Sequence, residues 1–286
     1  MNIPLFYIYQ GPVHILFGPV NAPINTAITE NITCKSMDLA NKFYYFKKAL
    51  DKETCEKIIQ LGKDKIQAET ANGRSVEGTT AGGFEKSRRA GATSRAVKTT
   101  QDLLNEGVKD TYIRDSKITW FDDEWLFELL KPYVYTANKE AGWNWNIDFH
   151  ENMQFTTYDS GGFYGWHTDG GSDHVSKYRR LIKGVSPVQL DEKGNPPHNW
   201  VTDQGMVGKI RKISITVNLT DETTYQGGDL MLDLGDHSMR GKYKVEEARE
   251  QGTIIIFPSF LYHCISPITS GTRYSLVMWS LGDPWK

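Results

Sequence analysis

The apolar and polar residues in the second half of the chain follow the two-residue period of β-strands. The clearest case is residues 210–219, where Ile213, Ile215, Val217 and Leu219 alternate with polar residues. This alternation predicts a strand with two different faces. Similar patterns predict further strands at residues 152–158, 163–168, 230–234, 253–257, 262–266 and 273–279. Short strands separated by turns are typical of a β-barrel or β-sandwich.

The first half of the chain combines strands with helices. Asp51 is a candidate helix N-cap, Glu53 stands in the first turn, and Gly62 is a candidate helix end. A second helix is expected from Asp122 or Asp123 through Ala137, because its apolar residues recur at helical spacing. Short strands are expected at residues 44–46 and 114–121. We expect the second helix to pack against the sheet.

Three segments have no clear periodicity. Residues 1–42 are expected to form an arm and carry no assigned chemistry. Residues 69–100, rich in Gly, Ser, Thr and Arg, are either a surface loop or a lid that orders over a substrate. Residues 172–208 are charged and contain prolines, which predicts an insertion on the rim of the barrel. Residues 43–286 would then be one domain, with helical support over 43–148 and a β core over 149–286.

Composition limits the classes of protein that need to be considered. The 286 residues are 39% hydrophobic and 24% charged, as in globular proteins, and the formal net charge is -2. A charge near zero gives no general attraction for nucleic-acid backbones. Three scattered cysteines, Cys34, Cys55 and Cys264, favour a reducing intracellular setting over a disulfide framework. Residues 1–20 lack a basic n-region and contain prolines, which disfavours export and membrane spanning.

The candidate chemistry is a set of metal-binding side chains. His167 and Asp169 are two residues apart in a strand-like segment, so their side chains face the same way. His263 opens a later strand, and Arg273 follows it after the next turn. Two histidines and one carboxylate on one face, with other positions open, form the facial triad of non-haem Fe(II) oxygenases.

On these residues, the chain from about residue 43 to its C-terminus resembles the Fe(II)/2-oxoglutarate-dependent dioxygenases. The closest resemblance is to the prolyl 4-hydroxylase-like branch, which has bacterial and phage-encoded members. It implies a mainly β fold with packed helices, namely a double-stranded β-helix, also called a jelly roll or cupin-like fold. It further implies that His167, Asp169 and His263 are the catalytic iron ligands.

The resemblance also assigns a cosubstrate site. Arg273, ten residues after His263, matches the basic residue that binds the distal carboxylate of 2-oxoglutarate. Ser275 completes an Arg-x-Ser pattern and would share that carboxylate. Tyr158 matches a tyrosine that is often hydrogen-bonded to the cosubstrate in this family.

The implied activity is hydroxylation of a peptidyl or amino-acid side chain, with proline the leading candidate. Fe(II), 2-oxoglutarate and O₂ would be required, with ascorbate as a possible reductant, and succinate and CO₂ would be released. We expect a peptide or protein substrate, no membrane partner, and a location in the cytoplasm of a bacterium or a phage-infected host. Nucleic acid is disfavoured, because Trp279 stands where demethylases of the alkylation-repair type carry a second arginine.

Two other functions are compatible with a metal-binding barrel. A cupin-like isomerase or hydrolase would use the metal as a Lewis acid. Such an enzyme needs no carboxylate clamp at the position of Arg273. A non-catalytic jelly-roll binding protein is the second alternative. The intact set of ligands together with Arg273 argues against it.

Overall fold

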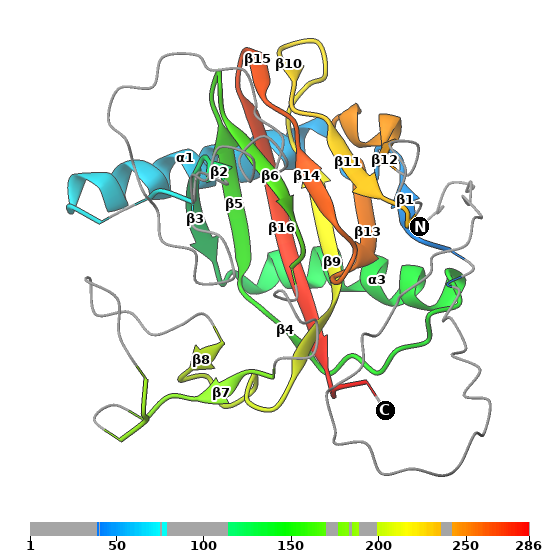
Figure 1. Cartoon of the computed structure of the whole chain (residues 1–286). Helices are drawn as coiled ribbons and strands as arrows, with labels where there is room; N and C mark the ends of the chain where they lie inside the picture. The colour runs from blue at the N-terminus through cyan, green and yellow to red at the C-terminus, as the bar shows by residue number, and fades with distance from the viewer. Residues whose placement is uncertain are drawn as a thin grey trace, which may run out of the picture.

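The computed structural model describes residues 39, 41–74, 76–78, 114–169, 177–182, 185–188, 199–235 and 242–285. Its larger, major sheet has the strand order β1-β13-β9-β16-β5-β3, with β4 paired to β16 (Figure 1). The bounds are β1 Tyr44–Phe46, β3 Lys117–Phe121, β4 Phe149–His150, β5 Met153–Tyr158, β9 Ile210–Asn218, β13 Ile254–Pro258 and β16 Arg273–Gly282. All pairings within this sheet are antiparallel.

A second, minor sheet has the order β12-β11-β14-β6-β2. Its bounds are β2 Arg114–Asp115, β6 Phe163–His167, β11 Leu230–Asp233, β12 Lys242–Lys244 and β14 His263–Ile265. Two short pairs lie outside the main sheets, formed by β7 Arg179–Arg180 with β8 Trp200–Val201 and by β10 Gln226–Gly227 with β15 Ile268–Ser270.

The two sheets face each other across a shared core. Buried residues of the major sheet, such as Tyr158 and Phe257, cluster with buried residues of the minor sheet, such as Leu232 and Ile265. Consecutive strands of the later chain alternate between the sheets: β13 lies in the major sheet, β14 in the minor sheet and β16 in the major sheet again. This arrangement is a double-stranded β-helix, and it confirms the expected fold class.

Strand β13 shows why the second half of the chain forms two layers. Ile254 and Ile256 point to the cluster under the helices, whereas Ile255 and Phe257 point to the cluster between the sheets. Both faces of the strand are therefore buried. A continuous apolar run is the pattern that such a strand requires.

Helices α1 (Lys52–Ala71) and α3 (Glu124–Glu140) cover the outer face of the major sheet (Figure 1). Asp51 caps α1 by accepting a hydrogen bond from the Thr54 amide, as expected. The expectation that Gly62 ends this helix is wrong, because the helix continues to Ala71. Gly62 is buried instead, and a Cβ there would overlap the ring of Phe155 on β5. The glycine allows the helix to approach the sheet closely.

The structure describes only parts of the three segments that lack a periodic pattern in the sequence. Residues 69–71 belong to α1, and residues 76–78 bond to the β3 region through Val76 and Gly78, whereas residues 79–113 lie outside the described residues. Within the expected insertion, Tyr178 packs against Trp279 and Leu281 of β16. Most of the expected arm, including residues 1–38, also lies outside the described residues.

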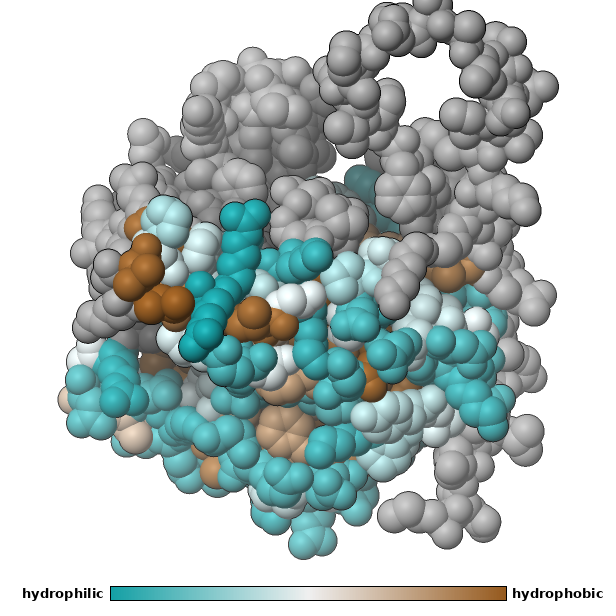
Figure 2. Space-filling view, turned by 90° about the horizontal axis from the view of Figure 1, so that it is seen from below, coloured by the Kyte–Doolittle hydropathy of each residue, from teal (hydrophilic) through white to brown (hydrophobic). Residues whose placement is uncertain are grey.

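The described surface is mainly polar. Figure 2 shows a predominantly hydrophilic face with scattered hydrophobic residues. Large exposed hydrophobic side chains occur at separate places along the described chain, among them Trp120, Val185 and Tyr262. No helix in the described part of the chain combines the length and the apolar character needed to cross a membrane.

The contact between Gly62 and Phe155 generates a test of the packing between helix and sheet. Gly62→Ala should destabilise the protein by about 1–2 kcal/mol, because steric overlap outweighs the higher helix propensity of alanine. Urea unfolding measures the effect. Gln60→Ala, on the exposed side of α1, is the control and should change stability by less than about 0.5 kcal/mol. A Gly62→Ala protein as stable as the parent would contradict the close approach.

Candidate metal centre and active site

Strand pairing brings the two candidate histidines together. His167 is the last residue of β6, His263 is the first residue of β14, and the two are register partners across the minor sheet. Register partners in antiparallel strands have their Cβ atoms about 5 Å apart. The imidazole ring centroids accordingly lie 4.2 Å apart.

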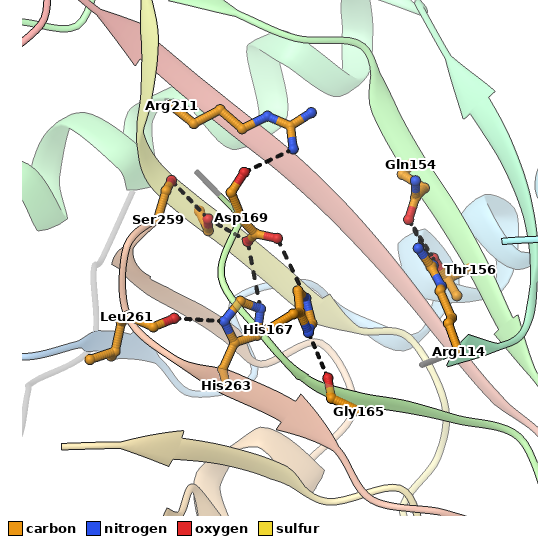
Figure 3. A network of polar contacts seen from close by, with 11 residues as sticks. Arg114, Gln154, Thr156, Gly165, His167, Asp169, Arg211, Ser259, Leu261 and His263 are labelled. Atoms are coloured by element: carbon orange, nitrogen blue, oxygen red, sulfur yellow. Dashed lines mark hydrogen bonds and ion pairs between the residues drawn. The ribbon is translucent and has the colours of Figure 1, made fainter. Parts of the chain in front are cut away.

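Asp169 completes the cluster from the turn after β6. Its amide donates a hydrogen bond of 2.9 Å to the Ser259 carbonyl, which ties this turn to the connection between β13 and β14. Its Oδ1 lies 3.6 Å from Nε2 of His167 and its Oδ2 lies 3.6 Å from Nε2 of His263 (Figure 3). The candidate ligand atoms of all three residues lie within 4.8 Å of one another. One cation can contact all three.

Backbone hydrogen bonds fix the tautomers of both histidines. Nδ1 of His167 lies 2.8 Å from the Gly165 carbonyl, and Nδ1 of His263 lies 2.8 Å from the Leu261 carbonyl. A carbonyl only accepts, so each Nδ1 carries a proton and donates it. In the neutral ring Nε2 then has a free lone pair, and this is the atom that faces Asp169. Such hydrogen bonds orient histidine ligands in metal sites.

The charge states of the cluster also suit a metal ion. Burial, and then the proximity of His167, lowers the pKa of His263 to about 4, so this imidazole is neutral at pH 7. Burial alone raises the pKa of Asp169, but His263, His167 and Arg211 outweigh it and hold the pKa below its ordinary value. Neutral imidazole nitrogen and ionised carboxylate oxygen are the donors that Fe(II) takes in facial-triad sites. The residues present therefore fit Fe(II).

Aromatic rings enclose the two histidines. The ring of Tyr164 stacks on His167 with centroids 3.5 Å apart, and the edge of Phe257 meets His263 at 4.7 Å. Burial raises the pKa of Tyr164, so its hydroxyl stays protonated. The rings limit the rotation of both imidazoles and keep them in place.

The three candidate ligands line one cavity together with Tyr158, Arg273 and Ser275. Arg273, Ser275 and Trp279 alternate onto the cavity face of β16, so the cavity follows this strand. Arg273 and Tyr158 are register partners at the start of β16. The structure thus brings all six sequence-predicted site residues into one cavity.

The end of the cavity near Arg273 contains polar atoms that lack partners. Arg273 is 2% exposed, and its Nη1 has no hydrogen-bond partner among the described residues. The same holds for the hydroxyl of Tyr225, which is 1% exposed. A Cβ at Gly228 would lie 3.0 Å from Cδ of Arg273 and 3.4 Å from Cε2 of Tyr225, so the two side chains flank this glycine. Buried donors without partners are costly and mark a place where a ligand or water belongs.

Arg114 is a second buried arginine on the cavity wall. Its guanidinium donates to Gln154 at 2.8 Å and to Thr156 at 3.3 Å, both on β5, and lies 4.4 Å from the ring centroid of Tyr164. It therefore connects the minor sheet to the major sheet beside the metal-binding cluster (Figure 3). The sequence alone does not point to Arg114, because its position next to the cavity depends on pairing between β2 and β6.

A buried ion pair lies on the other side of Asp169. Arg211 donates to Glu151 and, at 3.2 Å, to the Asp169 carbonyl. Glu151 also accepts a hydrogen bond of 3.0 Å from the hydroxyl of Tyr178, in the expected insertion. The guanidinium of Arg211 lies 3.9 Å from the ring centroid of Trp279. These contacts couple the insertion and the cavity wall to the backbone of a candidate ligand.

Comparison with known proteins agrees with this geometry. Residues 153–281 match the model of the 2OG-Fe(II) oxygenase superfamily. This segment of the chain is therefore similar to the superfamily, and it includes all six candidate site residues. The resemblance expected from the sequence is confirmed for this segment.

Curated proteins that are similar to this chain include several named PKHD-type hydroxylase. One from Synechococcus sp. strain CC9605 is 38% identical over 110 residues, which are 38% of this chain and 47% of the relative. PKHD-type hydroxylase YbiX of Escherichia coli is 24% identical over 125 residues, which are 44% of this chain and 40% of the relative. The chain therefore spans less than half the length of these relatives.

Solved structures with a similar fold include a Pseudomonas putida prolyl-4-hydroxylase. It is 15% identical, with a TM-score of 0.45, and the match covers 84% of this chain and 91% of that one. A Trichoplax adhaerens prolyl hydroxylase, solved with a hypoxia-inducible-factor peptide fragment, is 14% identical with a TM-score of 0.47, covering 84% and 83%.

Removal of one candidate ligand tests the metal centre. His263→Ala should weaken Co(II) or Fe(II) binding by more than about 100-fold, because even residues that only support metal ligands contribute about 10- to 100-fold. Isothermal titration under anaerobic conditions measures the affinity. His150→Ala is the matched control, since His150 bonds to Tyr135 and Ser280 away from the cluster. Unchanged affinity in His263→Ala would remove this residue from the site.

Proposed function

We propose that the protein is an Fe(II)- and 2-oxoglutarate-dependent dioxygenase that hydroxylates a peptidyl or amino-acid side chain. One observation carries the proposal. The cavity that contains two imidazoles and one carboxylate also contains Arg273, a buried arginine whose Nη1 has no partner among the described residues. A metal-binding cluster and an anion-binding group in one cavity suit a cosubstrate that is both a metal chelator and a carboxylate.

The roles of the site residues follow from their positions. His167, Asp169 and His263 would hold Fe(II) through single atoms, leaving other coordination positions open. Arg273 would bind the distal carboxylate of 2-oxoglutarate with charge-assisted hydrogen bonds. Tyr158, the register partner of Arg273, and Ser275, on the same face of β16, would complete that site.

Tyr225 extends the proposed cosubstrate site. Its buried hydroxyl lacks a partner among the described residues, and its ring edge and the side chain of Arg273 both lie next to Gly228. Two donors that converge on one carboxylate would satisfy both buried groups when the cosubstrate binds. The arrangement would select a dicarboxylate of fixed length.

The bound iron and cosubstrate would supply the oxidising chemistry, in which O₂ converts 2-oxoglutarate to succinate and CO₂ as one substrate C–H bond becomes C–OH. The chain would position the reactants and exclude water. Tyr164 and Phe257 shield the histidines, and the low polarity around them strengthens the electrostatic contacts of the site. Ascorbate would serve only to restore Fe(II) after turnover without substrate.

The substrate would enter beside Trp279. The indole Nε1 of this residue is buried, lacks a partner among the described residues, and belongs to a side chain that lines the cavity. It can donate a hydrogen bond to a carbonyl of a peptide. Proline, the leading candidate from the resemblance, is the first target to test.

A reducing location inside a cell, as in the cytoplasm of a bacterium or a phage-infected host, suits this chemistry. Cys55 and Cys264 are free thiols, and both are buried. Fe(II) also persists more readily under reducing conditions. We therefore place the proposed reaction in that setting.

The cosubstrate role of Arg273 can be tested by kinetics. The parent protein with Fe(II) should convert 2-oxoglutarate to succinate, and Arg273→Ala should raise the KM for 2-oxoglutarate by the equivalent of about 1.5–3 kcal/mol. Arg273→Lys should lie between the two, because lysine keeps the charge but not the planar fork. Arg180→Ala, on the exposed strand β7, is the control and should leave the KM unchanged.

The outcome also separates the alternative functions. A parent protein that binds iron but forms no succinate with any candidate peptide would favour a Lewis-acid isomerase or hydrolase, or a binding protein. An unchanged KM in Arg273→Ala would show that another residue binds the distal carboxylate.

Substrate identity requires a separate experiment. A peptide library incubated with the protein, Fe(II), 2-oxoglutarate and ascorbate should yield peptides heavier by one oxygen atom, mostly at proline, as read by mass spectrometry. Asp169→Ala is the negative control. Hydroxylation of another residue type, with proline peptides unreacted, would reject proline and retain the dioxygenase.

A further inference from the structure

A chain of two buried hydroxyl groups leads to one oxygen of Asp169. The Ser214 hydroxyl lies 2.6 Å from Oδ2 of Asp169, and the Ser259 hydroxyl lies 2.9 Å from that of Ser214. Both serines are fully buried. Ser214 is on β9, and Ser259 directly follows β13. Figure 3 shows Ser259 beside the metal-binding cluster.

Elementary bonding rules fix the direction of these hydrogen bonds. Ser214 donates its only hydroxyl proton to Oδ2 of Asp169. The contact between the two serines then requires that Ser259 donates to Ser214. A length of 2.6 Å is typical of a strong, charge-assisted O–H···O⁻ bond.

We propose that Ser214 is a positioning residue that keeps Asp169 a one-oxygen metal ligand. Oδ1 and Oδ2 lie 3.6 Å from Nε2 of His167 and of His263, respectively, and Oδ2 also accepts the Ser214 hydroxyl. This hydrogen bond occupies a lone pair of Oδ2, so the proposed metal would bind Oδ1. A carboxylate that bound through both oxygens would occupy one more coordination position, and one fewer would remain for cosubstrate and O₂. The inference rests on the metal site of the proposed function.

Ser259 supports Oδ2 of Asp169 indirectly, through Ser214. Its hydroxyl orients Ser214, its carbonyl accepts the Asp169 amide at 2.9 Å, and its amide donates to the Lys212 carbonyl at 2.9 Å. One residue thus holds both the backbone and, through Ser214, the carboxylate of Asp169. Loss of its hydroxyl leaves the direct bond from Ser214 intact, so its effect should be smaller.

Metal binding and spectroscopy test the proposal without turnover. Ser214→Ala should weaken Co(II) binding by about 10- to 100-fold, the range found for residues that support metal ligands, and should alter the visible absorption of the Co(II) protein. Ser259→Ala should show a smaller change of the same kind. Ser214→Thr retains the hydroxyl and should restore both properties. Affinity is measured by competition with a chromophoric chelator.

Ser280→Ala is the matched control, because Ser280 is also fully buried and its hydroxyl bonds to His150 outside the cluster. If Ser214→Ala binds Co(II) with the affinity and absorption of Ser280→Ala, the proposal is overturned. If Ser214→Ala does not fold, parent-like Co(II) affinity and absorption in Ser259→Ala overturn it instead. A parent protein that binds no Co(II) would contradict the metal site itself, which is a different failure.

Discussion

The pairing of β6 with β14 is the interaction on which the candidate site depends. It places His167 opposite His263, although almost a hundred residues of chain separate them. Strand hydrogen bonds hold the two backbones, and carbonyls two residues before each histidine hold the rings. The position of each Nε2 is therefore set by backbone structure as well as by side-chain packing. A site built on strands in this way is largely formed before any ligand binds.

The cavity is an unusual part of this fold, because it keeps charged groups away from water. Each buried charge has compensation on the wall: Asp169 accepts from Ser214, Arg211 pairs with Glu151, and Arg114 bonds to β5. Arg273 is the exception, with Nη1 unpartnered among the described residues. Leaving one buried cation partly unsatisfied costs stability. A carboxylate ligand would recover that cost on binding, so the affinity for the proposed cosubstrate would depend on how the core is built.

Residue spacing in the sequence predicts many of the strands and several of the candidate site residues. The sequence predicts four of the site residues, because short motifs and strand alternation are local properties of the sequence: His167, Asp169, His263 and Arg273. The sequence does not predict the supporting residues, because their roles depend on contacts across sheets. Ser214 belongs to a strand whose alternation is evident in the sequence, but the polar Ser214 and Thr216 are buried instead of facing water. The sequence also suggests the wrong role for Gly62, a helix end. Only the contact with the ring of Phe155 explains why a glycine is needed there.

Strand β9 illustrates how the same residues constrain both folding and function. Ile213, Ile215 and Val217 fill the layer beneath the helices, while Ser214 and Thr216 face the space between the sheets. A slip of the strand by one residue would push hydroxyl groups into the apolar layer and present isoleucine to the carboxylate of Asp169. A one-residue shift of β9 is therefore unfavourable on both faces of the strand. The polar residues of β9 that face the space between the sheets therefore also help to fix the register of this strand in the barrel.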